Sequence, residues 1–172
     1  MESIGTAAMT LIHSFPPVSA RDATTLILGS MPGIASLTAG QYYAHPRNQF
    51  WPLMGELVGA GPQLSYPQRI SALKTARIAL WDVMASCVRP GSLDARIDPH
   101  SVTANDFAGF LQSHRAITSV FFNGAAAEGA FLRHVERTLP RALALTRLPS
   151  TSPAHAALSF AQKLDAWRAI LH

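Results

Sequence analysis

Four short apolar runs constrain the fold of this chain more than any other feature of its sequence. They occupy residues 24–29 (TTLILG), 77–82 (RIALWD), 118–123 (TSVFFN) and 142–147 (ALALTR). Each run is too apolar for a strand with one face in water, and such runs are typical of parallel strands that are buried on both faces. The sequence therefore predicts four strands in one buried sheet.

Helical patterns lie between these runs and after the last one. Two of them carry start signals, because Pro67 suits a first helical turn and Thr103 with Asp106 resembles a capping pair. Strand followed by helix, repeated four times, predicts a parallel sheet with helices on both sides. The expected fold class is α/β, a three-layer α/β/α sandwich with a four-stranded parallel central sheet. The predicted helices span residues 48–58, 67–74, 104–113, 125–137 and 157–171.

The length and composition indicate one domain. With 172 residues, 48% of them hydrophobic and 14% charged, the chain can build a single core. We expect this domain to span residues 22–172, after a loosely packed lead-in at residues 1–21. No apolar run approaches the ~18 residues that span a bilayer, and the first residues do not resemble a secretion signal. The single cysteine, Cys87, excludes an internal disulfide and a metal site built on several thiolates. We expect a cytoplasmic protein that has no membrane partner.

Polar segments follow three of the four predicted strands. In an open α/β sheet, ligands bind outside the carboxyl ends of the strands, so these segments mark the expected site. The net charge of +4 permits a polyanionic partner without identifying one. The arginines that lie in or beside these segments are Arg47, Arg89, Arg96 and Arg147.

Three stretches within these segments are distinctive. Residues 29–33 (GSMPG) can form a tight turn whose backbone amides face a ligand, although alone they also fit an ordinary turn. Residues 42–51 (YYAHPRNQFW) place aromatics, a histidine, an arginine and an amide directly before a helix. Residues 148–171 (LPSTSPAHAALSFAQKLDAWRAIL) combine a Pro-Ser loop with the last predicted helix.

Together these stretches resemble the uracil-DNA glycosylase superfamily. The first two resemble its motif 1, above all that of the mismatch-specific branch, and the third resembles motif 2, a loop that presses into the DNA minor groove. Met31 replaces the usual water-activating Asp or Asn, and Leu148 replaces the His or Asn that usually opens motif 2. Both departures resemble the hypoxanthine-DNA glycosylase branch. The resemblance covers nearly the whole chain from about residue 22.

The resemblance implies a monofunctional hydrolase, a DNA repair enzyme that flips a deaminated base, hypoxanthine above all, out of duplex DNA and cuts its N-glycosidic bond. It implies no metal and no cofactor, and we expect a monomer. No lysine lies in the motif 1 stretches or in the Pro-Ser loop of motif 2, so nothing suggests a Schiff-base lyase step. Three alternatives remain: a uracil- or mismatch-specific glycosylase of the same fold, an α/β domain that binds nucleotides, and a DNA-binding protein that has lost catalysis. The second lacks the G-x-G-x-x-G and G-K-[ST] signatures.

The same resemblance assigns the central residues of the site. Asn48 is the expected catalytic residue, because an amide can orient a water molecule, although Asn is also a favoured helix cap. Tyr43 takes the place of a ring that stacks on the extruded base, or is a rim aromatic. Asp82 ends its strand where relatives place an Asn that reads a base edge, and its carboxylate could accept from N1–H of hypoxanthine. A structural strand-end role for Asp82 is nearly as well supported.

The remaining expected site residues fall into two groups. The role of His155 stays open between insertion into the DNA stack, a phosphate contact and assistance to the leaving group. Hydroxyl and backbone N–H groups in the motif 2 loop are expected to contact phosphates. The further base-binding residues are Ser30, Met31 and Asn123, and the DNA-binding residues are Arg47, Arg147, Ser150, Thr151, Ser152 and His155.

Overall fold

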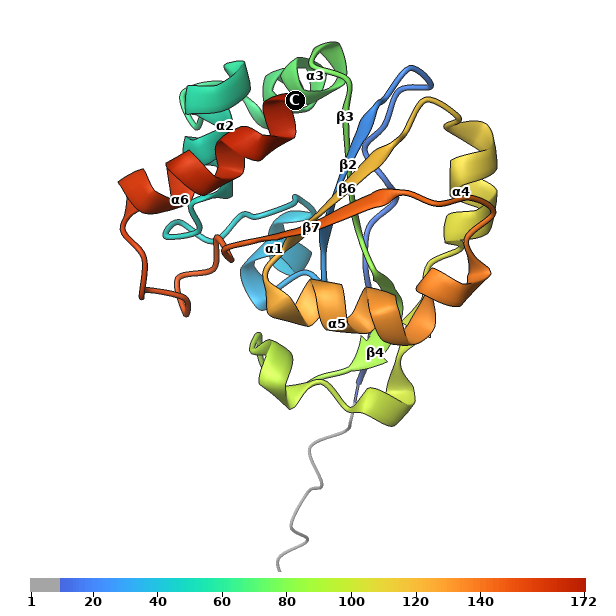
Figure 1. Ribbon diagram of the computed structural model, residues 1–172. Helices are drawn as coiled ribbons and strands as arrows, with labels where there is room; N and C mark the ends of the chain where they lie inside the picture. Colours follow the sequence, from blue (N-terminus) through green and yellow to red (C-terminus); the bar gives the residue numbers. More distant parts are fainter. Residues whose placement is uncertain (1–9) are drawn as a thin grey trace, which may run out of the picture.

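A four-stranded parallel sheet forms the centre of the molecule in the computed structural model, which describes residues 10–172 (Figure 1). Its strand order is β3-β2-β6-β7, and every neighbouring pair is parallel. The four strands lie close to the four apolar runs, so the predicted α/β fold with a parallel central sheet is confirmed. Their bounds are Thr25–Gly29 for β2, Ile78–Asp82 for β3, Ser119–Asn123 for β6 and Ala144–Leu148 for β7.

Helices cover both faces of this sheet (Figure 1). Successive side chains of a strand point to opposite faces, and β2 shows this directly. Leu26 and Leu28 pack against α4 and α5, whereas Ile27 packs with α2, α3 and α6. The helices are α1 (Ile34–Ala39), α2 (Phe50–Val58), α3 (Tyr66–Thr75), α4 (Phe107–Ser113), α5 (Ala125–His134) and α6 (Phe160–Trp167), and short 3₁₀ turns are η1 (Asp94–Arg96), η2 (Pro99–Ser101), η3 (Glu136–Thr138) and η4 (Arg168–Leu171).

The strand β7 corrects one expectation about burial. Within it Leu148 alone is buried, and the other residues are exposed or half-buried. β7 lies at an edge of the sheet with a neighbour on one side only, whereas the edge of β3 at the opposite end is covered by Val18, which pairs with Leu80. An apolar run therefore marked a strand correctly but did not distinguish a central strand from an edge strand.

A second, antiparallel sheet was not predicted. It has the order β1-β4-β5, formed by Leu11–His13, Met84–Val88 and Thr103–Ala104. The strand β1 lies in the expected lead-in and pairs with β4 in register, so the described part of that segment is not loosely packed. The expectation for residues 1–9 lies outside the described residues. Because β5 occupies Thr103, the expected capping pair is also corrected: Asp106 itself caps α4 by accepting from the N–H of Gly109.

Other start signals agree with the sequence. Pro67 lies in the first turn of α3, where Ser65 and Gln68 form a capping box. Ser159 and Gln162 form a second capping box at the start of α6, three residues after the predicted start of that helix. Among residues 10–172, no helix combines the length and the apolar character that crossing a membrane requires.

Candidate active site

A cavity of about 320 Å³ lies at the carboxyl ends of the four parallel strands. This is the edge of the sheet at which the sequence places the site. The segments that leave β2, β3, β6 and β7 all contribute to its wall. Of the predicted residues, the cavity brings together Ser30, Met31, Tyr43, Asn48, Asp82, Asn123, Ser150, Thr151 and Ser152.

Gly29 allows two functional groups to converge on the end of β2. A Cβ atom at this position would lie 2.5 Å from Asp82 Oδ1 and 2.8 Å from Tyr43 Oη, closer than such atoms can approach. A side chain at Gly29 would therefore push the carboxylate and the phenol apart. The glycine that opens the GSMPG turn is required for this close approach.

Asp82 is a buried carboxylate with an unused acceptor. The residue is 3% exposed, and among the described residues none donates a hydrogen bond to its buried Oδ2 atom. The pKa of Asp82 is raised from 3.8 to about 7, mainly by burial and then by the charge of Asp94, while Arg89 partly opposes both. A carboxylate that merely tied down a strand end would accept from nearby amides. Its free oxygen points instead to a ligand that donates.

Tyr43 is held in an uncommon backbone conformation. Its φ of 54° lies in the left-handed region, which a bulky residue rarely adopts. One face of its ring stacks on Phe50, with ring centroids 4.2 Å apart. Its buried hydroxyl has no hydrogen-bond partner among the described residues. Burial, and after it the charge of Asp82, raises the pKa of the phenol, so the hydroxyl remains a neutral donor.

Asn48 serves as a cap in the structure and also lines the cavity. Its Oδ1 accepts from the N–H of Phe50 at 2.9 Å, which supports the start of α2, while Gln49 makes no side-chain cap bond. The structural role that the sequence left open is therefore present. A carbonyl oxygen has two lone pairs, so the cap does not prevent Asn48 from holding a water molecule as well.

Thr151 ties three parts of the site together. Its N–H donates to Asn123 Oδ1 and its Oγ1 accepts from Asn123 Nδ2, both at 2.9 Å. Its carbonyl accepts from the N–H of Gln49, so motif 1, the end of β6 and motif 2 are joined. Thr151 is 1% exposed, and this burial does not fit its expected role as a DNA contact. Asn123 borders the cavity, but both ends of its amide hold the loop.

The rest of the motif 2 loop is anchored by α6. Lys163 Nζ donates to the carbonyl of His155 at 2.7 Å, and Trp167 Nε1 donates to the carbonyl of Pro149 at 2.9 Å. Ser150 and Ser152 accept from backbone N–H groups further along the loop. His155 is exposed and lies outside the cavity lining. The loop thus presents a fixed shape although it contains no regular secondary structure.

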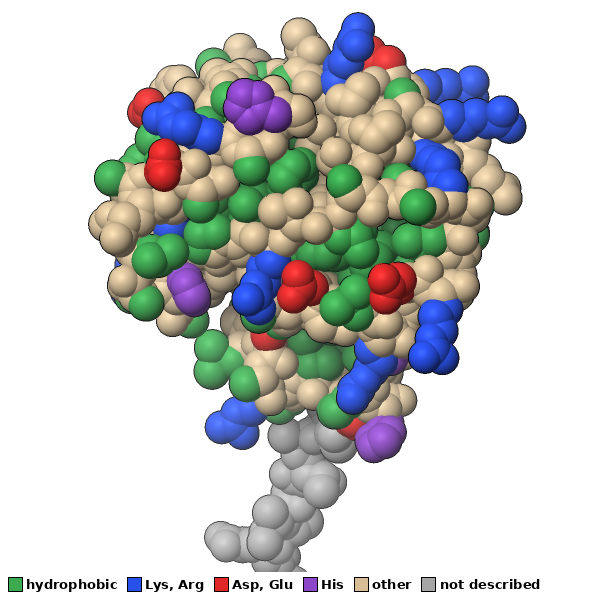
Figure 2. Space-filling view, in the orientation of Figure 1, with side chains coloured by type: hydrophobic (Ala, Val, Ile, Leu, Met, Phe, Trp, Pro, Cys, Tyr) green, Lys and Arg blue, Asp and Glu red, His purple; other side chains and the backbone are tan. Residues whose placement is uncertain are grey.

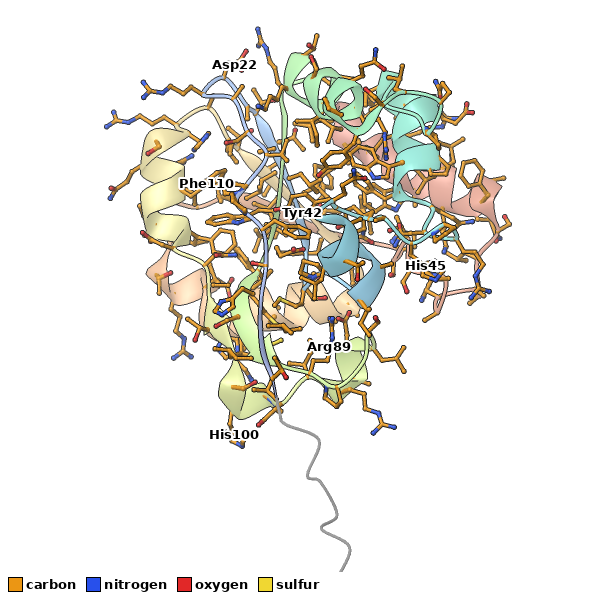
Figure 3. The ribbon with its side chains drawn as sticks, turned by 180° about the vertical axis from the view of Figure 1, so that it is seen from behind. Asp22, Tyr42, His45, Arg89, His100 and Phe110 are labelled. Carbon is orange, nitrogen blue, oxygen red and sulfur yellow. The ribbon has the colours of Figure 1, made fainter. Side chains whose placement is uncertain are left out.

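The segment after β4 forms a wall of the cavity, and no site residue was predicted in this segment. Ser30 Oγ donates to Asp94 Oδ1 at 2.8 Å, and the N–H of Ile34 donates to Ser92 Oγ at 2.8 Å. Arg89 Nη2 donates to the carbonyl of Pro32 at 2.6 Å, and Figure 3 shows Arg89 between α1 and this segment. The proline- and arginine-rich sequence after β3 was a signal of this wall, but nothing in it singled out Asp94.

Two predicted arginines lie outside the cavity lining. Arg47 is exposed, and its backbone N–H donates to Nδ1 of His45. His45 lies near the edge of the molecule (Figure 3). Arg147 is exposed on β7 and pairs with Glu128, with 3.7 Å between Nη1 and Oε1. Both side chains can therefore meet a ligand that is larger than the cavity.

No group of three or more His, Cys, Asp and Glu side chains within residues 10–172 is arranged to hold a metal ion. The polar side chains around the cavity are instead two acids, two phenols, an imidazole, amides and hydroxyls. Such groups can bind a heterocyclic base by hydrogen bonding and ring stacking.

Comparison with known proteins decides the family. The family model of the uracil DNA glycosylase superfamily matches residues 16–171. The chain belongs to this superfamily. The resemblance drawn from motifs 1 and 2 is therefore confirmed, and the cavity lies between the segments that carry those motifs.

Relatives within the superfamily narrow the comparison. A hypoxanthine DNA glycosylase from Methanosarcina barkeri is 40% identical over 113 residues, which cover 65% of this chain and 70% of the relative. A hypoxanthine DNA glycosylase from Methanosarcina acetivorans is 38% identical over 116 residues, covering 67% of this chain and 72% of the relative. The solution structure of a candidate uracil DNA glycosylase from M. acetivorans matches 95% of this chain and all of its own, with a TM-score of 0.76 and 32% identity.

Proposed function

We propose that this protein is a monofunctional DNA glycosylase that removes hypoxanthine from duplex DNA and leaves an abasic site. The superfamily and the two relatives named for this activity support the reaction class. The observation that carries the choice of hypoxanthine over adenine is the buried Oδ2 of Asp82, which has no donor among the described residues.

Base reading follows from hydrogen-bond chemistry. Hypoxanthine carries an N1–H donor, whereas adenine presents a bare N1 acceptor at the same position. The ionised Asp82 can only accept, so it pairs with hypoxanthine and leaves adenine facing a lone pair.

Bond cleavage needs support at two ends. As the glycosidic bond breaks, the sugar becomes positively charged and the departing base gains negative charge. We assign Asn48 to a water molecule that attacks the sugar, because its amide borders the cavity on a rigid helix start. Tyr43 would stack on the extruded base, with Phe50 supporting the far face of its ring.

A uracil glycosylase is the second candidate. Uracil carries an N3–H donor beside carbonyl acceptors, so Asp82 could also accept from uracil. The same solved structural neighbour is described in terms of uracil. The relative rates at which hypoxanthine and uracil are released decide between the two candidates.

The experiment compares duplexes that hold hypoxanthine, uracil or xanthine at one position, with adenine there as the control. Single-turnover incubation is followed by alkaline cleavage of abasic sites. We expect hypoxanthine to be released fastest and adenine far more slowly than any of the three. Faster release of uracil would replace hypoxanthine by the second candidate, and release of no base would refute the glycosylase assignment.

A further inference from the structure

Two large apolar side chains stand exposed at the mouth of the cavity. Ile34 is 54% exposed and Leu93 is 55% exposed, and both line the cavity. Within residues 10–172 the other large hydrophobic residues that are exposed lie outside the cavity lining: Leu11, Leu132 and Leu171. Exposing two such side chains beside a polar site costs solvation free energy, which a binding role explains.

The segment that carries Leu93 is fastened on both sides of it. Ser92 Oγ accepts from the N–H of Ile34, and Asp94 Oδ1 accepts from Ser30 Oγ. Arg89, bound to the carbonyls of Pro32 and Gly91, fixes the approach to this segment. Leu93 is thus presented at a set position relative to the GSMPG turn. A backbone segment that is already ordered loses little conformational entropy when its side chain inserts into a partner.

The motif 2 loop exposes no comparable side chain. Its one large aliphatic residue between β7 and α6 is Leu158, which is half-buried, and its exposed stretch is Ala154-His155-Ala156-Ala157. A duplex from which one nucleotide has been extruded contains a gap between the neighbouring bases, and proteins that unstack DNA commonly fill such a gap with an apolar wedge. The loop that presses on the minor groove thus exposes no large apolar side chain, whereas the opposite wall of the cavity exposes Leu93.

We propose that Leu93, supported by Ile34, fills the space that the extruded nucleotide leaves in the base stack. The partner is the damaged duplex, so this inference rests on the proposed function. Figure 2 shows the surface hollowed at its left edge, above the lower lobe. The wedge would belong to the segment between β4 and η1 and act across the cavity from motif 2. The segment that carries Leu93 and the motif 2 loop would then together keep the extruded base outside the base stack.

The test compares Leu93→Ala with Leu132→Ala, which removes an exposed leucine of α5 away from the cavity. Single-turnover excision is measured on hypoxanthine in duplex and in single-stranded DNA. The single strand needs no wedge, because its bases have no pairing to break. We expect Leu93→Ala to lower the duplex rate by at least about tenfold and the single-strand rate by much less, since unstacking costs a few kcal/mol. Leu132→Ala should change neither rate.

A second readout follows base extrusion directly. 2-Aminopurine placed beside the lesion becomes brighter when its stacking neighbour leaves, and Leu93→Ala should reduce that rise, whereas Leu93→Met should restore it. Equal losses on duplex and single strand would show that Leu93 only shapes the cavity. Unchanged duplex rates and fluorescence would overturn the proposal and leave His155 as the candidate. If the wild type released no hypoxanthine, the proposed function would fail, while fluorescence in the lesion duplex would still report on Leu93.

Discussion

At the scale of single residues, Asp82 combines a functional advantage with a cost to folding. Its pKa, raised to about 7 by burial, means that the folded state binds a proton that the unfolded chain has released above its ordinary pKa of 3.8. The free energy of unfolding therefore falls as the pH rises from about 4 to 7. In this site the neutral form of Asp82 is more stable than its ionised form up to about pH 7.

The pH dependence of base choice follows from the same carboxylate. Above pH 7 the ionised Asp82 accepts from N1–H of hypoxanthine, whereas below it the protonated acid can donate to N1 of adenine. We expect the ratio of hypoxanthine to adenine release to fall as the pH is lowered through about 7. Single-turnover rates on both duplexes between pH 5.5 and 8.5 measure this ratio, with protein folding checked at each pH. A constant ratio would assign Asp82 to structure.

Asp82→Asn tests the same contact by a change of chemistry. The amide keeps the shape but can present either a donor or an acceptor, so discrimination against adenine should relax by roughly ten- to hundredfold. The variant should also lose the pH dependence of stability described above. Thermal unfolding at pH 5 and pH 8 gives the second measurement. Retained discrimination together with a flat stability profile would show that other groups read the base.

Asn48 separates catalysis from capping. Asn48→Ala should lower the single-turnover rate by at least ~10²-fold, the scale for losing a positioned polar group in a transition state. It should also lower the free energy of unfolding by about 1 kcal/mol, because the bond to the N–H of Phe50 is lost. Asn48→Ser is the matched control, since serine also caps helices well. If Asn48→Ser restores both stability and rate, the residue is a cap only.

At the scale of elements, the sequence was most informative for the strands that are buried on both faces of the sheet. β2, β3 and β6 lie within the predicted runs because their side chains are buried on both faces. The six-residue α1 was missed, since it is too short for a clear helical period and Gly33 provides no side-chain cap. β4 was missed because its mixed sequence MASCV follows β3 without a turn signal.

The residues of the candidate site also differ in how well the sequence predicts them. Tyr43, Asn48 and Asp82 could be placed from motifs, because each lies in or beside a stretch with a recognisable pattern. Asp94 and Lys163 could not, since the groups that they bind, Ser30 Oγ and the His155 carbonyl, lie elsewhere in the sequence. Pairings of this kind are set by tertiary packing and leave no local pattern.

Lys163 on α6 tests whether the motif 2 loop must be rigid. Its side chain is buried, and burial lowers the pKa of the ammonium group. Lys163→Met keeps the volume and removes the donor to the His155 carbonyl. We expect nearly unchanged thermal stability, because replacing a buried charge by an apolar side chain is often neutral. We also expect weaker duplex binding and faster amide exchange in residues 149–159. Lys74→Met, on an exposed site of α3, is the control. Unaltered exchange would remove the proposed bracing role.

At the scale of the whole molecule, binding should depend on salt. Arg47 and Arg147 flank the cavity, so each Arg→Ala change should make the slope of log K against log salt shallower by about 0.9. The effect of Arg147 should be the smaller one, since Glu128 already shares its charge. Binding of undamaged duplex at several salt concentrations gives the slopes, with Arg137→Ala on η3 as the control. Equal slopes in all four proteins would move the DNA interface elsewhere.

The central position of β2 has a consequence for how the chain acquires its site. Thr25 pairs with Ile78 on one side and with Ser119 on the other, and Asn123 of β6 pairs in turn with Leu148 of β7. Such distant pairings slow folding, because long loops must close before contacts repay them. Refolding followed by amide protection should show the carboxyl ends of β2 and β6 protected together, late in the reaction. A ribosome-bound chain that still lacks β7 would then have no finished pocket, so excision would begin only after β7 has been synthesised.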